Sequence, residues 1–172
     1  MKLYQTFSLG GALNNLSWDD ITISFNNLNL QLIYQDWNWL INETIRPIMM
    51  STFGDLFYQK KDLKVYYLDT LEGNEKYITN TESEFIEFIN IKENQENYLL
   101  SELVFNLINK GFILKEKQCY SFIIPPIIGG KAETNNVKII NIPIWISIIG
   151  QLHKQVKELP IGTKINKFKI SK

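Results

Sequence analysis

Two short runs of aromatic and branched residues, separated by four polar ones, most constrain how this chain can fold. Residues 53–58 and 63–68 have the composition of β-strands, and the polar residues 59–62 between them have the length of a hairpin loop. A third run, 76–79, follows after a short turn. The pattern predicts an antiparallel meander at the centre of the protein.

Most other segments carry the periodicity of helices. Apolar residues at helical spacing, together with start and stop signals, predict four helices. Their ranges are 29–41, 81–90, 98–110 and 143–158. The second of them begins at a capping-box pattern, Thr81-x-x-Glu84, and Gly111 marks the end of the third.

A further strand is predicted over residues 119–124, in the same small antiparallel or mixed sheet. It would end at Pro125-Pro126, because proline has no N–H to donate to a strand ladder. Val137, Ile139 and Ile140 could add one more short strand. We expect an α+β fold in a single domain over residues 1–172, since no linker or repeat divides the chain.

The chemistry open to this chain is narrow, because it holds one cysteine, Cys119, and one histidine, His153. We expect no metal and no cofactor, since a zinc site needs three or four ligands. A hydrolase dyad of Cys119 with His153 is one alternative, although nothing in the neighbouring residues supports it. The lone cysteine and the lack of a signal peptide or of a membrane-length apolar run predict a cytoplasmic protein that makes no membrane contact.

The charges sum to zero but are unevenly distributed. Residues 69–102 hold nine acidic residues against two lysines, whereas residues 110–172 hold eleven lysines against three glutamates. Such asymmetry can indicate an electrostatically steered partner site, or it can vanish when the two regions interleave in the fold. The C-terminal lysines carry no nucleic-acid-reading motif, so we expect no direct binding to nucleic acid.

Several short blocks stand in a distinctive order along the chain. They are Phe53-Gly54-Asp55-Leu56-Phe57, Leu68-Asp69-Thr70, Gln118-Cys119-Tyr120-Ser121-Phe122, Pro125-Pro126, Gly129-Gly130, Gly150-Gln151-x-His153-x-Gln155-Val156 and Leu159-Pro160-x-Gly162. Over about residues 37–165, these blocks resemble a bacterial family known for type VI secretion immunity. Because glycines set turns and prolines end elements, we interpret the marked residues as structural.

The resemblance implies a protein that neutralises a secreted DNase toxin by binding it. In that family the domain follows an N-terminal GAD-related domain, for which this chain has no room, so we expect a stand-alone version. A looser similarity to the SUKH immunity superfamily implies a scaffold of one sheet packed with helices.

These observations together predict a non-enzymatic protein that binds and neutralises a cognate toxin, with a nuclease as one candidate class. The alternative is a general interaction module without a toxin partner. The predicted partner surface combines acidic residues, which would steer a cationic toxin, with tyrosines as anchors. Its members are Asp69, Glu72, Glu75, Glu82, Glu84, Glu87, Tyr66 and Tyr77.

Overall fold

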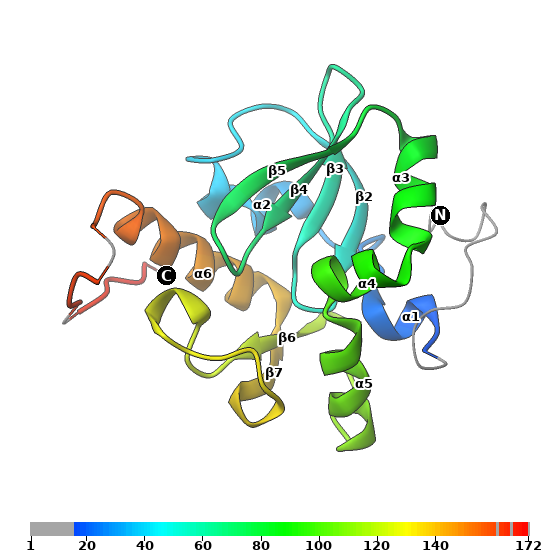
Figure 1. The fold of residues 1–172 in the computed structure, drawn as a ribbon. Helices are drawn as coiled ribbons and strands as arrows, with labels where there is room; N and C mark the ends of the chain where they lie inside the picture. Colours follow the sequence, from blue (N-terminus) through cyan, green and yellow to red (C-terminus); the bar gives the residue numbers. More distant parts are fainter. Residues whose placement is uncertain (1–15, 161, 166, 172) are drawn as a thin grey trace.

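The computed structural model describes residues 16–160, 162–165 and 167–171, and its centre is a five-stranded antiparallel sheet (Figure 1). The strands follow one another in chain order, so each pairs with its neighbour in the sequence. They are β1 (Thr22–Ile23), β2 (Arg46–Ser51), β3 (Leu56–Gln59), β4 (Val65–Asp69) and β5 (Asn74–Thr79). The predicted α+β class is confirmed, and the predicted meander corresponds to the last three strands.

Helices flank this sheet on two sides, with α3 and α4 on one side and α2 and α6 on the other (Figure 1). The α-helices are α1 (Trp18–Ile21), α2 (Leu30–Ile33), α3 (Glu82–Asn90), α4 (Lys92–Leu99), α5 (Ser101–Asn109) and α6 (Ile142–Val156). Three short 3₁₀ turns are η3 (Gln35–Trp37), η4 (Pro126–Ile128) and η5 (Thr134–Asn136). In the described part of the chain, no helix combines the length and the apolar character that a membrane span requires.

Alternating side chains give the sheet two different faces. Phe57 of β3 stands opposite Tyr67 of β4, and both rings pack against the helices of one side. The ring centroids of Phe57 and Phe85 are 4.8 Å apart, and those of Tyr67 and Tyr98 are 5.0 Å apart. Tyr58, the next residue in β3, therefore points to the opposite face, where it is fully buried.

The strand predicted from Phe53 begins only at Leu56. Gly54 has a φ of +94°, a conformation that glycine adopts without steric cost. The amide of Ser51 donates to the carbonyl of Asp55 at 2.9 Å, which closes the turn between β2 and β3. Of the sequence block Phe53–Phe57, the first three residues therefore form a turn, and only the last two belong to β3.

β2 is absent from the sequence-based prediction, because Pro47 and the two methionines near it lack the alternation of a half-buried strand. β4 begins at Val65, two residues later than predicted. Leu63 has a φ of +64° and stays in the turn, which lengthens the hairpin loop. Both differences come from local backbone conformation that residue type alone does not reveal.

The helix predicted over residues 81–90 is confirmed as α3, together with its cap. The hydroxyl of Thr81 accepts a hydrogen bond from the amide of Glu84 at 3.1 Å. The carboxylate of Glu84 reaches back to the amide of Asn80 at 2.9 Å, one residue earlier than in the usual capping box.

The helix predicted over residues 98–110 is in fact two helices, α4 and α5. They are divided at Leu100, whose φ of +51° is left-handed and interrupts the helical path. The carboxylate of Glu96 accepts from the hydroxyl of Ser101 at 2.8 Å and from the amide of Glu102 at 2.7 Å. Glu96 thereby satisfies the first turn of α5, which stabilises the break.

Residues 29–41 do not form the continuous helix that was predicted, but α2, η3 and a further turn. The reason lies in contacts with α6. The indole of Trp37 is fully buried and donates to the carbonyl of Ile146 at 3.1 Å. The hydroxyl of Ser147 donates to the carboxylate of Asp36 at 2.6 Å. These tertiary contacts outweigh the helical periodicity of the segment.

The strand predicted over residues 119–124 does not join the main sheet. As β6 (Gln118–Phe122) it pairs with β7 (Val137–Asn141) in a separate two-stranded sheet. Among the described residues, one backbone hydrogen bond links the two sheets, from the amide of Tyr120 to the carbonyl of Thr52 at 2.8 Å. Because Thr52 lies in the β2–β3 turn and not in a strand, this contact does not extend into a ladder of hydrogen bonds. The last predicted helix corresponds to α6, with Pro143 in its first turn.

Candidate partner-binding surface

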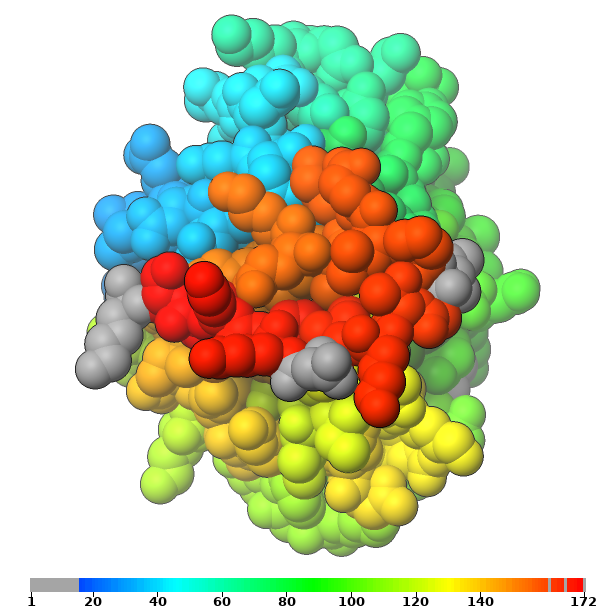
Figure 2. Space-filling view, turned by 90° about the vertical axis from the view of Figure 1, so that its left-hand side faces the viewer, coloured from blue at the N-terminus to red at the C-terminus, as the bar shows by residue number. Residues whose placement is uncertain are grey.

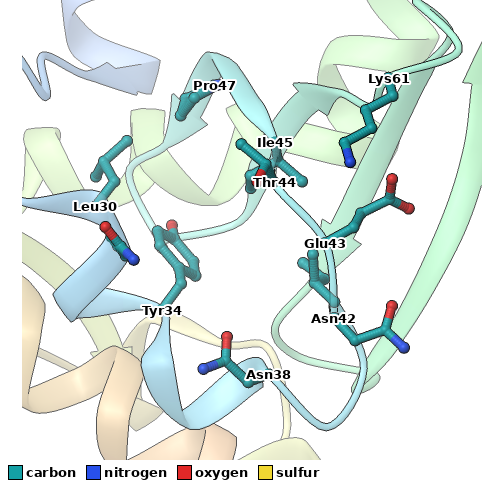
Figure 3. Close-up of a pocket in the computed structure, with 11 residues that line it drawn as sticks. Leu30, Tyr34, Asn38, Asn42, Glu43, Thr44, Ile45, Pro47 and Lys61 are labelled. Carbon is teal, nitrogen blue, oxygen red and sulfur yellow. The ribbon is translucent and has the colours of Figure 1, made fainter.

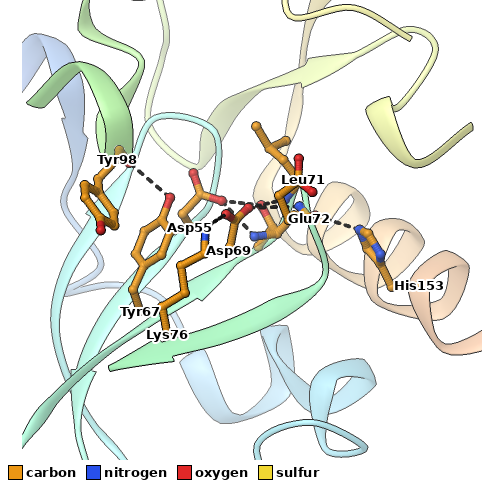
Figure 4. Close-up of polar contacts among 9 residues, drawn as sticks. Asp55, Tyr67, Asp69, Leu71, Glu72, Lys76, Tyr98 and His153 are labelled. Atoms are coloured by element: carbon orange, nitrogen blue, oxygen red, sulfur yellow. Dashed lines mark hydrogen bonds and ion pairs between the residues drawn. The ribbon is translucent and has the colours of Figure 1, made fainter. Parts of the chain in front are cut away.

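Asp69 lies inside the fold rather than on the predicted surface (Figure 4). Only 7% of it is exposed. Its Oδ1 accepts from the amides of Leu71 and Glu72 at 3.1 and 2.9 Å, and its Oδ2 accepts from Lys76 Nζ at 2.8 Å. Asp69 therefore holds the turn between β4 and β5, and little of its carboxylate is left for a partner.

Two further acidic residues of the predicted set are neutralised by cations of the chain itself. Glu75 accepts from Lys60 Nζ at 2.7 Å and also from the hydroxyl of Tyr58. Glu82 forms an ion pair with Arg46. Such partly exposed pairs are worth at most about 1 kcal/mol to stability, but they cancel the charge that a distant partner would sense.

Glu84, Glu87 and Glu93 are the exposed carboxylates of α3 and α4, whereas Glu96 of α4 is half-buried and caps α5. All three are exposed, and in the described ranges no lysine or arginine forms an ion pair with them. Glu93 was not in the predicted set, although it lies in the same acidic run of the sequence. Glu72, in the β4–β5 turn, is exposed as well.

Tyr66 and Tyr77 lie on the face of the sheet opposite to α3. They stand side by side on β4 and β5 with ring centroids 6.0 Å apart, and 52% of Tyr77 is exposed. Lys60 Nζ lies 4.3 Å above the ring of Tyr66, whose hydroxyl donates to Asp62 at 2.9 Å. The predicted surface is thus divided into two parts, which border on the edge strand β5.

Asp55, a residue of the first sequence block, is buried at the β2–β3 turn (Figure 4). Its Oδ1 accepts from the amide and the hydroxyl of Thr70 at 2.9 and 2.6 Å, and its Oδ2 accepts from the hydroxyl of Ser51 at 2.7 Å. Burial raises the pKa of Asp55 to about 6, and the nearby charge of Asp69 adds to the rise. The carboxyl group fastens the β2–β3 turn to the end of β4.

His153 of α6 is 3% exposed and contacts the same region from the other side. Its Nε2 lies 3.0 Å from the carbonyl oxygen of Thr70. Burial lowers the pKa of His153, which favours the neutral ring. In the tautomer with a proton on Nε2, His153 donates to Thr70 and ties α6 to the meander.

Cys119 is fully buried in β6. Burial, and to a lesser degree the neighbouring Asp55 carboxylate, raises the pKa of its thiol. A thiol held in its protonated form is a poor nucleophile. Within the described residues, the hydrogen bonds of His153 lead to the backbone and not to Cys119. The environment of both side chains is that of packed structural residues.

The other residues of the sequence blocks also have structural positions. A Cβ on Gly130 would lie 1.7 Å from the carbonyl oxygen of Ile124, so only glycine fits this loop, and Gly129 has a φ of +92°. Pro160 and Gly162 follow the end of α6. Pro125 and Pro126, the latter the first residue of η4, are half-buried. The other members are buried in the core or in its turns, namely Phe53, Leu56, Phe57 and Tyr120.

A groove with a volume of about 870 Å³ opens beside α2 and the segment that leads to β2 (Figure 3). Tyr34 reaches into it, but its hydroxyl already donates to the carbonyl of Gly54 at 2.7 Å. The other lining side chains are mainly apolar or amide groups, with one residue of each charge: Leu30, Gln31, Asn38, Ile41, Asn42, Glu43, Thr44, Ile45, Pro47 and Lys61. The groove holds neither Cys119 nor His153 and is remote in sequence from the acidic helices.

The described ranges contain no cluster of side chains that could bind a catalytic metal ion. There, no group of three or more His, Cys, Asp or Glu side chains is placed to hold a metal ion. What the structure does offer is a packed fold with exposed carboxylates on α3 and α4 and an exposed tyrosine at the sheet edge.

Residues 79–153 match the family model described as T6SS immunity protein Tdi1, C-terminal. The matched stretch runs from the end of β5 into α6 and contains Glu84, Glu87, Glu93, Cys119 and His153. The resemblance to a type VI secretion immunity family is thereby confirmed over this stretch. The sequence blocks that begin at positions 53, 68 and 159 lie outside it.

The fold is similar to that of a solved protein, described as the crystal structure of Atu4351 from Agrobacterium tumefaciens. The TM-score is 0.50 at 17% sequence identity, and the likeness covers 87% of each chain. At this identity it concerns the fold alone. A comparison with curated protein sequences finds no match.

Proposed function

We propose that this chain, whose residues 79–153 match the Tdi1 C-terminal family, is a type VI secretion immunity protein that binds and neutralises a cognate toxin. The family match is the observation that carries this proposal. The burial of Cys119 and His153 agrees with it, because both side chains serve packing and hydrogen bonding. On this account the chain is a single cytoplasmic domain, and its work is binding rather than catalysis.

The exposed carboxylates Glu84, Glu87 and Glu93 support a cationic partner, such as a nuclease whose own substrate is anionic. Uncompensated charges of one sign raise the rate at which an oppositely charged partner is captured. The three glutamates lie inside the stretch that matches the family. Tyr77, an exposed aromatic side chain on the edge strand β5, can serve as an anchor.

Co-purification tests the proposal. The product of the gene beside this one is expressed together with an affinity-tagged copy of the chain, and the eluate is analysed for a stoichiometric complex. A stable complex, whose partner is toxic when expressed alone, supports immunity. A partner that binds but is harmless would instead favour a general interaction module.

A further inference from the structure

The hairpin between β3 and β4 presents an exposed leucine at its tip. Leu63 is 67% exposed, and its φ of +64° is a left-handed conformation that a bulky side chain rarely adopts. Its amide donates to the carbonyl of Lys60 at 3.1 Å, and its carbonyl accepts from Gln59 Nε2 at 2.7 Å. The hairpin projects beyond the sheet (Figure 1). Hydrogen bonds thus hold an apolar side chain in a strained position, although that side chain is not part of the core.

The groove beside α2 adjoins this hairpin, since Lys61 is one of its lining residues (Figure 3). Figure 2 shows the two segments next to each other at the top of the molecule, with the hairpin in teal and the segment before β2 in cyan. The groove is lined by the buried side chains of Tyr34 and Ile41 and by the half-buried Ile45 and Pro47. Its volume of about 870 Å³ is several times that of a leucine side chain.

The charges of the hairpin tip and of the groove are complementary. Lys61 and Lys64, on either side of Leu63, are exposed and form no ion pair in the described ranges. Glu43 lines the groove, where its carboxylate lies 3.4 Å from Lys60 Nζ and 34% of its side chain is exposed. A tip with a leucine between two lysines therefore fits an apolar groove that carries a carboxylate on its wall.

We propose that the groove binds a second copy of this chain, and that two copies pair by inserting Leu63 of each into the groove of the other. Because the tip and the groove adjoin, a single two-fold axis can relate both contacts, as in isologous dimers. Burial in the partner accounts for an exposed apolar side chain in a strained conformation. The surface lies outside residues 79–153, so the inference does not depend on the proposed toxin.

Sedimentation equilibrium of the full chain tests the pairing, and we expect a concentration-dependent dimer. Leu63→Gly should weaken this dimer by roughly 100-fold, because two leucines leave the interface and burial of each contributes about 10-fold or more. Glycine tolerates the positive φ, so this variant keeps the fold, and an equal or higher melting temperature verifies that. Leu159→Gly changes another exposed leucine outside the groove and should dimerise as the wild type does.

A mixture of two variants tests whether the insertion is reciprocal. Thr44→Arg obstructs the groove at an exposed lining residue but keeps Leu63, whereas Leu63→Gly keeps the groove intact. Each variant alone should pair weakly, but the mixed pair regains one contact of tip and groove. We therefore expect it to be about 10-fold tighter than either homodimer. A wild type that stays monomeric at millimolar concentration, or a dimer that Leu63→Gly leaves equally stable, would overturn the proposal, as would a mixture that pairs no better than its components.

Discussion

Gly73 lies directly against the imidazole of His153, so closely that a Cβ at Gly73 would stand 2.1 Å from Nδ1. At the opposite edge of the imidazole, Nε2 lies 3.0 Å from the carbonyl oxygen of Thr70. The histidine is therefore held between two points of the β4–β5 turn. This contact fixes α6 to the meander, although the two segments are far apart in the sequence.

Gly73→Ala should destabilise the protein by about 2–4 kcal/mol, because the new methyl group meets a buried ring and the φ of +69° disfavours alanine. In a His153→Ala background the steric conflict is gone, so only about 1 kcal/mol of backbone strain should remain. Urea denaturation of the wild type, both single variants and the double variant measures this coupling. Costs that simply add would show that the two residues do not interact as described.

Asp55 should make stability fall as the pH rises. Its pKa increases from 3.8 to about 6 on folding, so the folded state holds the proton more tightly and ionisation opposes folding. The stabilisation is complete below the unfolded pKa and is lost as pH rises through about 6. Relative to Asp55→Asn, the wild type should lose on the order of 2 kcal/mol of unfolding free energy between about pH 4 and about pH 7.

Denaturant titrations of both proteins at these two pH values give the comparison. His153 is present in both, so its opposite dependence, in which a lowered pKa costs stability as the pH falls, cancels in the difference. If wild type and Asp55→Asn show the same pH dependence, the pKa of Asp55 is the same in the folded and unfolded states, which contradicts the prediction.

Lys117→Gly should stabilise the protein by about 0.5–1 kcal/mol. Lys117 is exposed and has a φ of +63°, which strains a residue with a Cβ and not a glycine. Lys115→Gly is the matched control, since Lys115 is also an exposed lysine of the same loop but lacks a positive φ. Thermal unfolding should show opposite shifts for the two variants, and a loss of stability in both would contradict the strain.

Removing the exposed charge of α3 and α4 should slow the capture of a cationic toxin. For the triple variant Glu84→Gln, Glu87→Gln and Glu93→Gln, we expect an association rate lower by roughly 10-fold at low salt, with a smaller effect at high salt. The control variant carries the same change of charge at three glutamates outside these helices, Glu116, Glu133 and Glu158. Stopped-flow kinetics with the co-purified partner distinguish them, and equal slowing in both would show that only net charge matters.

Local signals in the sequence were sufficient for part of the fold. The cap of α3 and the turn after β4 depend on residues within a few positions of one another, and both were foreseen. The left-handed break at Leu100 and the burial of Trp37 depend on Glu96 and on Ile146 of α6 respectively. The Trp37–Ile146 contact is tertiary, whereas the Glu96–Ser101 bond is local but accompanies a left-handed residue; helical periodicity encodes neither.

The candidate surface, too, could be predicted from the sequence only in part. The acidic run was evident, but Arg46 and Glu82 are 36 residues apart, and their pairing was not readable from the sequence. The opposite orientation of Tyr66 and Tyr67 follows from strand alternation and could have been predicted. Which face the helices cover is known only from the packing of Phe57 against Phe85.

Growth of cells that express the product of the adjacent gene, with and without this chain, tests the central claim most directly. If the chain is an immunity protein, that product stops growth when expressed alone, and co-expression of the wild-type chain restores it. Toxicity that persists despite a folded, abundant chain, or an adjacent product without toxicity, would contradict the proposed function.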